Sequence, residues 1–252
     1  MKTNIFHTVN AGLYLWSGET GLLIDGLHAG RAQGFSPLPE GVGRALRTHC
    51  GLFAHLNALL FTHLHGDHYD HALLLEALRG EAPPLVYGPE LSETSVEARP
   101  IRPGLWFFHA GQAHVLCLET VHDGEVFRGD PHRSLLVRVN GESIFIAGDA
   151  LLRPDQAGVL GEYYGEPVAA AFVNLYQLAG EEGLAFLRAL APRRIFLYHE
   201  PFPQDDQFCY SVMARQVLRR FPADLPRPER LAQMSWIDGA APAWNVLRSE
   251  GA

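Results

Sequence analysis

Cysteine is scarce in this sequence, and the positions of the few cysteines exclude two common uses of the residue. The 3 cysteines lie at positions 50, 117 and 209, far apart and without a repeated spacing. Neither a disulfide framework nor a cysteine-rich zinc module is built from such a set. We therefore expect a reduced, cytoplasmic setting.

Long hydrophobic runs are also missing. No stretch of roughly 18 apolar residues occurs, so we expect no membrane-spanning helix and no membrane partner. The first residues, MKTNIFHTVNAGLYLWSG, interrupt their apolar positions with Asn, His and Gly. We therefore expect no signal-peptide core there.

An excess of positive charge is the third thing that the sequence lacks. The formal net charge is -8 at pH 7, whereas proteins that bind nucleic acid backbones cluster Lys and Arg. We therefore expect no nucleic acid partner. With 47% hydrophobic and 19% charged residues, the composition is that of a globular protein. Residues 1–252 are expected to form a single domain of two packed αβ halves.

The apolar residues that are present alternate between strand-like and helix-like patterns. Asn140-Gly141 stands between two such runs, which is a strong signal for a tight β-hairpin, and a Gly- and Pro-rich loop is expected at 26–41. Two packed sheets flanked by helices are the natural architecture. The sequence predicts strands at 4–8, 12–16, 21–24, 56–62, 85–87, 106–109, 114–119, 134–139, 143–147, 168–173 and 194–198, and helices at 42–54, 69–78, 180–190 and 206–221.

The stretch THLHGDHYDH, residues 62–71, concentrates histidine and aspartate directly after the predicted strand at 56–62. His63, His65, Asp67 and His68 follow one another in a short turn, although histidine occupies only 13 of 252 positions. Imidazole and carboxylate suit a borderline divalent cation such as zinc, and iron or manganese accepts the same ligands. If Asp67 instead caps the next helix, capping accounts for one aspartate and not for the histidines.

Further His and Asp residues follow other predicted strands in the same way. Side chains at strand ends are held by the strand and exposed by the loop, so catalytic groups collect there. Repetition of the pattern favours one shared site over a set of unrelated structural residues. The strand-end residues are Asp25, His63, His122, Asp149 and His199.

The ordered set resembles the metallo-β-lactamase superfamily. His63 to His68 match its HxHxDH signature, and Asp25 in LIDG, His122 in TVHDG, Asp149 in AGDA and His199 in LYHE supply the rest. The resemblance covers about residues 4 to 200 and implies a mixed α/β (α+β) fold, a four-layered αββα sandwich with the site at one edge of the two sheets.

The resemblance also implies roles for these residues. His63, His65 and His122 would hold one metal, Asp67, His68 and His199 a second, and Asp149 would bridge the two. Asp25 would brace the HxHxDH turn by hydrogen bonds without binding metal. The cofactors would be two divalent ions, Zn²⁺ in first place, with Mn²⁺ or Fe as alternatives.

A hydrolase is the function that these roles imply. Two divalent ions roughly 3.5–4 Å apart activate a shared water as hydroxide and polarise a carbonyl or phosphoryl oxygen. Asp67 is the candidate catalytic residue, orienting that hydroxide or taking its proton. We expect a small-molecule substrate with an ester, lactone, amide, thioester or phosphodiester bond. An iron-dependent oxidoreductase of the same fold, for example one oxidising persulfides, and a non-catalytic metal-binding protein stay open as alternatives.

Some neighbouring residues have two readings. Asp70 belongs either to the likeness between HGDHYD and a branch of sugar-phosphate lactonases and phosphodiesterases or to the first turn of a helix. His132 and Arg133 are expected on a loop, where they either meet an anion or lie in solvent. Phe35 and the pair Tyr163-Tyr164 are candidates for the pocket lining or for turn packing.

Overall fold

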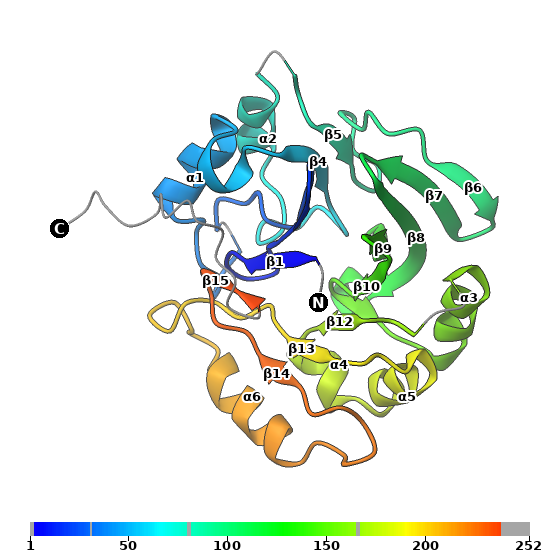
Figure 1. The fold of residues 1–252 in the computed structure, drawn as a ribbon. Helices are drawn as coiled ribbons and strands as arrows, with labels where there is room; N and C mark the ends of the chain where they lie inside the picture. Colours follow the sequence, from blue (N-terminus) through cyan, green and yellow to red (C-terminus); the bar gives the residue numbers. More distant parts are fainter. Residues whose placement is uncertain (1–2, 31, 80–81, 165–166, 238–252) are drawn as a thin grey trace.

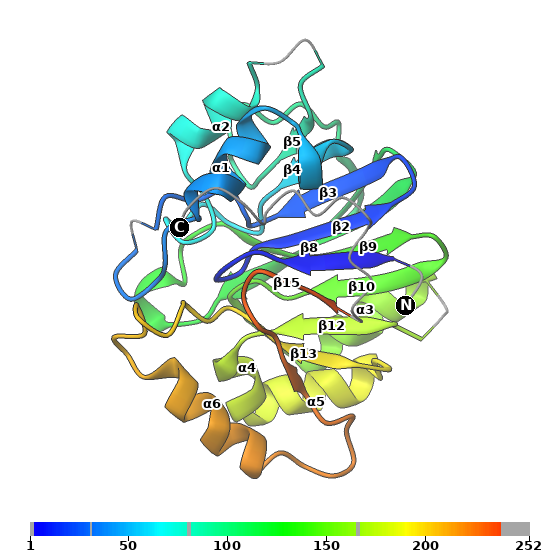
Figure 2. The same cartoon turned by 60° about the vertical axis from the view of Figure 1, so that its left-hand side comes forward.

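The computed structural model describes residues 3–30, 32–79, 82–164 and 167–237, and two β-sheets packed face to face form its centre (Figures 1 and 2). The first sheet runs in the order β15 (Ser235–Trp236), β1 (Asn4–His7), β2 (Leu13–Ser17), β3 (Thr20–Ile24), β4 (Leu56–Leu60) and β5 (Leu85–Tyr87). The second runs in the order β14 (Glu229–Arg230), β13 (Ile195–Leu197), β12 (Ala170–Val173), β10 (Glu142–Ile146), β9 (His132–Val139), β8 (Ala113–His122), β7 (Leu105–Ala110) and β6 (Arg99–Arg102), and β11 (Ala150–Leu151) pairs with β8.

Helices cover the outer face of each sheet. Figure 1 shows α1 (Glu40–Arg47) and α2 (His71–Ala77) on the side of the first sheet. The second sheet carries α3 (Pro154–Tyr164), α4 (Leu175–Ala179), α5 (Glu181–Leu190) and α6 (Tyr210–Arg219), and the short 3-10 helices are η1 (Gly51–Phe53) and η2 (Glu125–Phe127). The result is four layers in the order αββα, as the sequence predicted.

Three apolar cores hold these layers together. Along β10, Ile144 and Ile146 face the core between the sheets, while Phe145 faces the core under the helices of the second sheet. In the first sheet Leu60 faces the central core, and Leu59 faces the core under α1 and α2. Because successive strand residues point to opposite faces, strands covered on both faces must be apolar throughout. This explains the unbroken apolar runs of the sequence.

The Asn140-Gly141 hairpin is confirmed. Asn140 has φ 52° and Gly141 φ 75°, and Val139 pairs with Glu142 across the turn. Two successive residues with positive φ match the right-handed twist of the strands on either side. Because the turn sets the register, Ile144 and Ile146 face the central core together.

The helix bounds differ from the prediction at several ends. The helix predicted at 42–54 begins at Glu40 and ends at Arg47, and the positive φ values of His49 (46°) and Gly51 (55°) interrupt the helical path between α1 and η1. Asp70 caps α2 by accepting a hydrogen bond from the Leu73 N–H at 3.0 Å, which supports the helix-end reading of Asp70. Asp67 is therefore not the cap of α2. α3 was not predicted from the sequence, because its glycines weaken the helical pattern.

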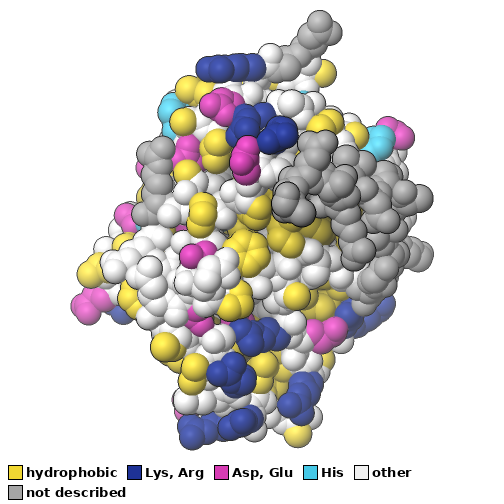
Figure 3. All heavy atoms as spheres, turned by 90° about the vertical axis from the view of Figure 1, so that its left-hand side faces the viewer, with side chains coloured by type: hydrophobic (Ala, Val, Ile, Leu, Met, Phe, Trp, Pro, Cys, Tyr) yellow, Lys and Arg dark blue, Asp and Glu magenta, His cyan; other side chains and the backbone are white. Residues whose placement is uncertain are grey.

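Charge and hydrophobicity are unevenly distributed over the face seen in Figure 3. Hydrophobic side chains gather across its middle, and most of the Lys and Arg side chains lie toward its lower and upper ends. Among the described residues no helix is long and apolar enough to cross a membrane.

The topology brings several strand ends to one edge of the molecule. β3 and β4 run parallel in one sheet, and β10, β12 and β13 run parallel in the other. β8 shares the direction of β10, since each is antiparallel to β9. The residues that follow these strands therefore meet at a common edge, which is where the candidate site lies.

Candidate metal centre

The predicted ligands converge into two clusters at this edge. Ligand atoms of His63, His65 and His122 all lie within 4.8 Å of one another. A second cluster with the same limit contains Asp67, His68, Asp149 and His199. The structure thus brings together all seven residues that the sequence pattern singled out, in the two groups that the resemblance implied.

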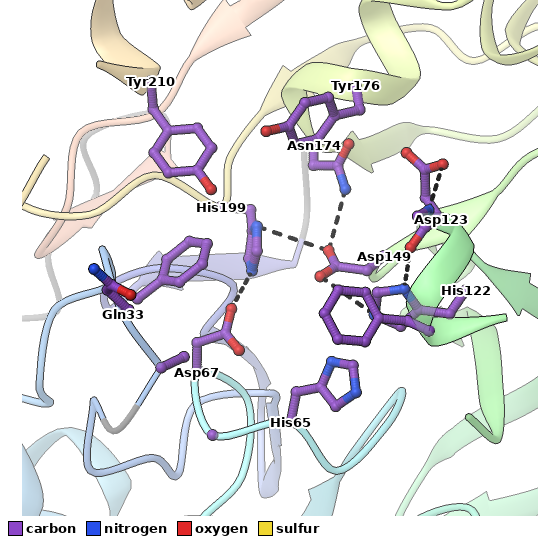
Figure 4. Close-up of a pocket in the computed structure, with 15 residues that line it drawn as sticks. Gln33, His65, Asp67, His122, Asp123, Asp149, Asn174, Tyr176, His199 and Tyr210 are labelled. Atoms are coloured by element: carbon purple, nitrogen blue, oxygen red, sulfur yellow. Dashed lines mark hydrogen bonds and ion pairs between the residues drawn. The ribbon is translucent and has the colours of Figure 1, made fainter. Parts of the chain in front are cut away.

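Asp149 lies between the two clusters. Its Oδ2 is 3.9 Å from His63 Nε2, 3.8 Å from His122 Nε2 and 3.5 Å from His68 Nε2. Its Oδ1 is 3.7 Å from His199 Nδ1 (Figure 4). A single carboxylate therefore faces histidines of both clusters, the position that a bridging ligand requires.

The second cluster is compact. His199 Nε2 lies 3.1 Å from Asp67 Oδ2 and 3.0 Å from His68 Nε2, and Figure 4 shows His199 between the carboxylates of Asp67 and Asp149. Burial raises the pKa of Asp149, but the charges of His199 and His68 outweigh burial and hold the pKa well below its ordinary value. Asp149 is therefore ionised at neutral pH and available to a cation.

Asp25 holds the turn that carries the histidine motif. Its Oδ1 accepts a hydrogen bond from the Thr62 N–H at 2.8 Å, and its Oδ2 accepts from the Thr62 hydroxyl at 2.7 Å. The same Oδ2 lies 3.2 Å from His68 Nδ1. Asp25 thus fixes the start of the turn and orients the ring of His68, so that His68 Nε2 faces the cluster.

Buried nitrogen atoms without a hydrogen-bond partner test whether these residues fit a metal. Nε2 of His63 and Nε2 of His122 are both buried and unpartnered, and both point toward Asp149. An unsatisfied buried polar atom costs roughly 1–3 kcal/mol. Burial also lowers the pKa of both rings, which leaves them neutral, the form that binds metal. The donor set fits divalent cations.

The proton on His68 predicts how metal affinity depends on pH. Burial lowers the pKa of His68, but the carboxylates of Asp25, Asp67 and Asp149 outweigh burial and raise the pKa well above its ordinary value of 6.5. An incoming cation must displace this proton, so metal affinity should rise with pH until the raised pKa is passed. Titrations with a competing chelator between pH 6 and pH 9 should show this rise.

The stability of the metal-free protein should change in the opposite direction. A raised pKa contributes stability that is fully present below the unfolded value, about 6.5, and is lost as pH rises through the folded value. The melting temperature of metal-free protein should therefore fall between pH 6.5 and pH 9. If metal affinity does not change with pH, metal binding does not displace a proton from His68, and His68 is not a metal ligand.

Two residues that the sequence analysis did not assign hold Asp149 in place. Asn174 follows β12 and donates from Nδ2 to Asp149 Oδ1 at 3.1 Å, while its own Oδ1 caps α4. His132 accepts the Asp149 N–H at Nε2, 3.0 Å away. Asn174 follows a strand just as the other five residues do, so the same pattern would have found it if amides had been included.

The reading of His132 as a loop residue is wrong. It begins β9 and is buried, and its Nδ1 lies 2.6 Å from the Thr120 hydroxyl. Burial lowers the pKa of His132 to about 3, so the ring is neutral and accepts the N–H of Asp149. Gly148 is required beside it, because a Cβ there would lie 2.7 Å from His132 Nε2 and 2.6 Å from Thr62 Oγ1.

His132→Ala should therefore weaken the site without removing a candidate ligand. The substitution leaves a buried N–H unpaired, which should cost about 1–3 kcal/mol of stability and about tenfold in metal affinity. Urea unfolding and metal titration measure the two effects. His109→Ala, at an exposed position of β7, is the control. Unchanged metal affinity in His132→Ala would contradict the positioning role.

Of the remaining residues that the sequence suggested for the pocket, only some line the cavity. Arg133 packs 3.9 Å above the Trp106 ring and does not line the pocket described below. His71 is exposed and lies 3.6 Å from Glu93. Tyr163 is exposed on α3, and the side chain of Tyr164 lies outside the described part. Phe35 does line the pocket.

The position of His122 makes a comparison within one strand possible. His122→Ala removes an unpartnered Nε2 of the first cluster and should lower bound metal, with turnover falling about a hundredfold. His114→Ala, at an exposed position of the same strand, should change neither. Metal content and rate are measured side by side for both variants, and equal effects would contradict the assignment of His122.

The cluster opens into a cavity of about 660 Å³. This is within the range of small-molecule sites, roughly 300–1,000 Å³. Figure 4 shows Tyr176 and Tyr210 on one side of the centre and His65 and His122 on the other. The described residues that line the cavity are Ala32, Gln33, Phe35, His65, Gly66, Asp67, His122, Asp123, Gly124, Phe127, Asp149, Asn174, Tyr176, His199 and Tyr210.

Comparison with known proteins identifies the fold. No family model and no curated protein matches this sequence. Solved structures do match: CmlA, a diiron β-hydroxylase from Streptomyces venezuelae, has 17% identity and a TM-score of 0.61 over 94% of this chain and 54% of that chain. The isothiocyanate hydrolase from Delia radicum gut bacteria has 16% identity and a TM-score of 0.62 over 93% of this chain and 98% of that chain.

A third match names the fold. The metallo-β-lactamase fold protein YhfI from Bacillus subtilis has 13% identity and a TM-score of 0.56, over 93% of this chain and 99% of that chain. The chain therefore has the metallo-β-lactamase fold, and the fold predicted from the resemblance is confirmed. The present chain spans about half the length, 54%, of the hydroxylase chain that it matches. Since proteins of this fold catalyse different reactions, function must be argued from the site.

Proposed function

We propose that this protein is a metal-dependent hydrolase that holds two divalent ions and cleaves an ester, lactone or phosphodiester bond of a small molecule. The observation that carries the proposal is the position of Asp149 Oδ2, within 3.9 Å of histidine Nε2 atoms from both ligand clusters. A carboxylate in this position offsets the repulsion between two nearby cations.

The seven clustered residues would hold the ions. When bound, two divalent ions lower the pKa of a water molecule and polarise the substrate oxygen. The residues of the first cluster are His63, His65 and His122, and those of the second are Asp67, His68, Asp149 and His199. Zn²⁺ suits this imidazole and carboxylate set, and Mn²⁺ and Fe accept it too.

Asp67 is the candidate catalytic residue. Burial raises its pKa, but the charges of His68 and His199 outweigh burial and lower it, so Asp67 is ionised at neutral pH. It lines the cavity and can orient the attacking water or accept its proton. In ester hydrolysis the hydroxyl of water goes to the carbonyl carbon and its proton goes to the leaving oxygen, so no oxidant is required.

Metal content and a substrate panel together test the proposal. Purified protein should contain two Zn²⁺ or Mn²⁺ per chain and should hydrolyse at least one of a set of 4-nitrophenyl esters, thioesters, lactones and phosphodiesters. An aryl isothiocyanate belongs in the panel, because one of the similar structures is an isothiocyanate hydrolase. Metal-loaded protein that hydrolyses none of these compounds would contradict the proposal.

Oxidation is the alternative that the same measurement separates. One similar structure is a diiron hydroxylase, and the ligand set here accepts iron. Iron in the purified protein, with visible absorption and oxygen consumption on adding a persulfide, would favour an oxidoreductase. Colourless protein with zinc and hydrolytic turnover would favour the hydrolase.

A further inference from the structure

We infer that the substrate is an uncharged carboxylic acid derivative with a ring-sized apolar group, rather than a phosphorylated molecule. This inference rests on the proposed hydrolase function and narrows it to one substrate class. The lining of the cavity, its charge and the rings at its mouth lead to the same conclusion.

The described lining of the cavity lacks cationic side chains. Among the described residues that line the cavity, none is Lys or Arg. Sites that recognise phosphate use Arg forks, Lys side chains or free N–H groups at a helix start. At the start of α4, a helix of only five residues that borders the cavity, the capping box already occupies the N–H groups of Asn174 and Gln177.

The charged residues of the lining, apart from histidine, are acidic. The acidic residues of the lining are Asp67, Asp149 and Asp123. Two dications would bring four positive charges, of which Asp67, Asp149 and a hydroxide would offset three. Asp123 adds a further negative charge to the lining, which disfavours an anionic substrate. An uncharged carbonyl compound needs only polarisation at one oxygen, so it does not depend on excess positive charge in the site.

An aromatic ring lies beside each of the two ligand clusters. Phe35 comes from the loop after β3, and its ring centroid lies 4.8 Å from that of His199. Phe127, from η2, lies 5.0 Å from His65 and 5.1 Å from His122. A substrate held at the centre would therefore have an aromatic ring beside each ligand cluster.

The mouth of the cavity exposes apolar side chains. Phe127 is 43% exposed and Tyr176 is 52% exposed, although both line the cavity. Next to Phe127, Val126 is 83% exposed. Grouped apolar side chains around a pocket mark a ligand-binding surface. These side chains would be covered by an apolar substituent of the substrate.

The test compares substrates that share a leaving group. The 4-nitrophenyl esters of acetic and phenylacetic acid differ only by one ring, and bis(4-nitrophenyl) phosphate supplies the same leaving group from an anion. With metal-loaded protein, kcat/KM should be at least about tenfold higher for the phenylacetate than for the acetate. The phosphodiester should be slower than both esters.

Two variants and a control locate the effect. Phe127→Ala and Tyr176→Ala should each raise KM for the phenylacetate and remove most of its advantage over the acetate in kcat/KM. Leu75→Ala, at an exposed apolar position of α2 away from the cavity, should keep the full advantage. Light scattering on the same proteins should show an unchanged oligomeric state.

Binding without turnover separates this inference from the proposed function. Acetohydroxamic and phenylacetohydroxamic acid share one metal-binding group, and calorimetry should show about tenfold tighter binding of the aryl compound, lost in Phe127→Ala. If this holds while no substrate is turned over, the hydrolase proposal fails and the apolar pocket stands.

Three results would overturn the inference. A phosphodiester that is cleaved faster than both esters would do so and leave the hydrolase function intact. The absence of any gain from the ring, in rate and in binding, would do so as well. A change of oligomeric state in Phe127→Ala or Tyr176→Ala would show that these side chains cover a second copy of the chain instead.

Discussion

Removal of metal should abolish turnover of this protein. Dialysis against a strong chelator takes away the cations that would lie among the seven clustered residues, and no Ser or Cys lines the described part of the cavity to act as a nucleophile instead. The rate should fall by at least about a thousandfold, and Zn²⁺ or Mn²⁺ should restore it. Element analysis of the dialysed protein accompanies each rate.

A control separates loss of the metal from loss of the fold. Circular dichroism should show that the metal-free protein keeps its secondary structure, because the three apolar cores do not depend on the cations. Full activity in protein shown to be free of metal would eliminate the proposed mechanism.

Asp149→Asn should lose both metals while the protein stays folded. The substitution keeps the size of the side chain and an oxygen that can accept the hydrogen bond from Asn174 Nδ2. It removes the negative charge that faces histidines of both clusters, so the repulsion between two cations is no longer offset. We expect less than one metal per chain and a rate at least about a thousandfold lower.

Asp155→Asn makes the same chemical change at an exposed position in the first turn of α3 and is the matched control. It should keep full metal content and rate. If Asp149→Asn retains two tightly bound metals and a near-normal rate, another carboxylate bridges the ions. Asp67, which lies in the same cluster, would then be examined next.

The candidate ligands could be predicted from the sequence because each follows a strand that is recognisable from its own residues. His63 follows an apolar strand through Phe61 and Thr62, and Asp149 follows one through a glycine with φ 59°. Each such unit is readable as a strand followed by a polar residue, and parallel strands end at the same edge of a sheet. Repetition of the unit in both halves was therefore enough to predict a shared site.

The residues that hold the candidate ligands in place could not be predicted in this way. His132 begins a strand, but the sequence beside it, GDPHRS, has the composition of a turn. Its role follows from the pairing of β8 with β9, which places the Thr120 hydroxyl at one ring nitrogen, and from the approach of Asp149 at the other. These partners are 12 and 17 residues away in the chain, so no local pattern contains the contact.

The sequence by itself determined the elements with strong local signals: the apolar strands, the Asn140-Gly141 hairpin and the strand-end ligands. Only the tertiary structure decided which aromatic side chains surround the centre. Phe35, Phe127, Tyr176 and Tyr210 come from four separate segments and line one cavity. Loops carry little periodicity, and their side chains meet only after the two sheets have packed. The lining of the cavity therefore depends on packing between distant segments, whereas the candidate metal ligands follow from the strands themselves.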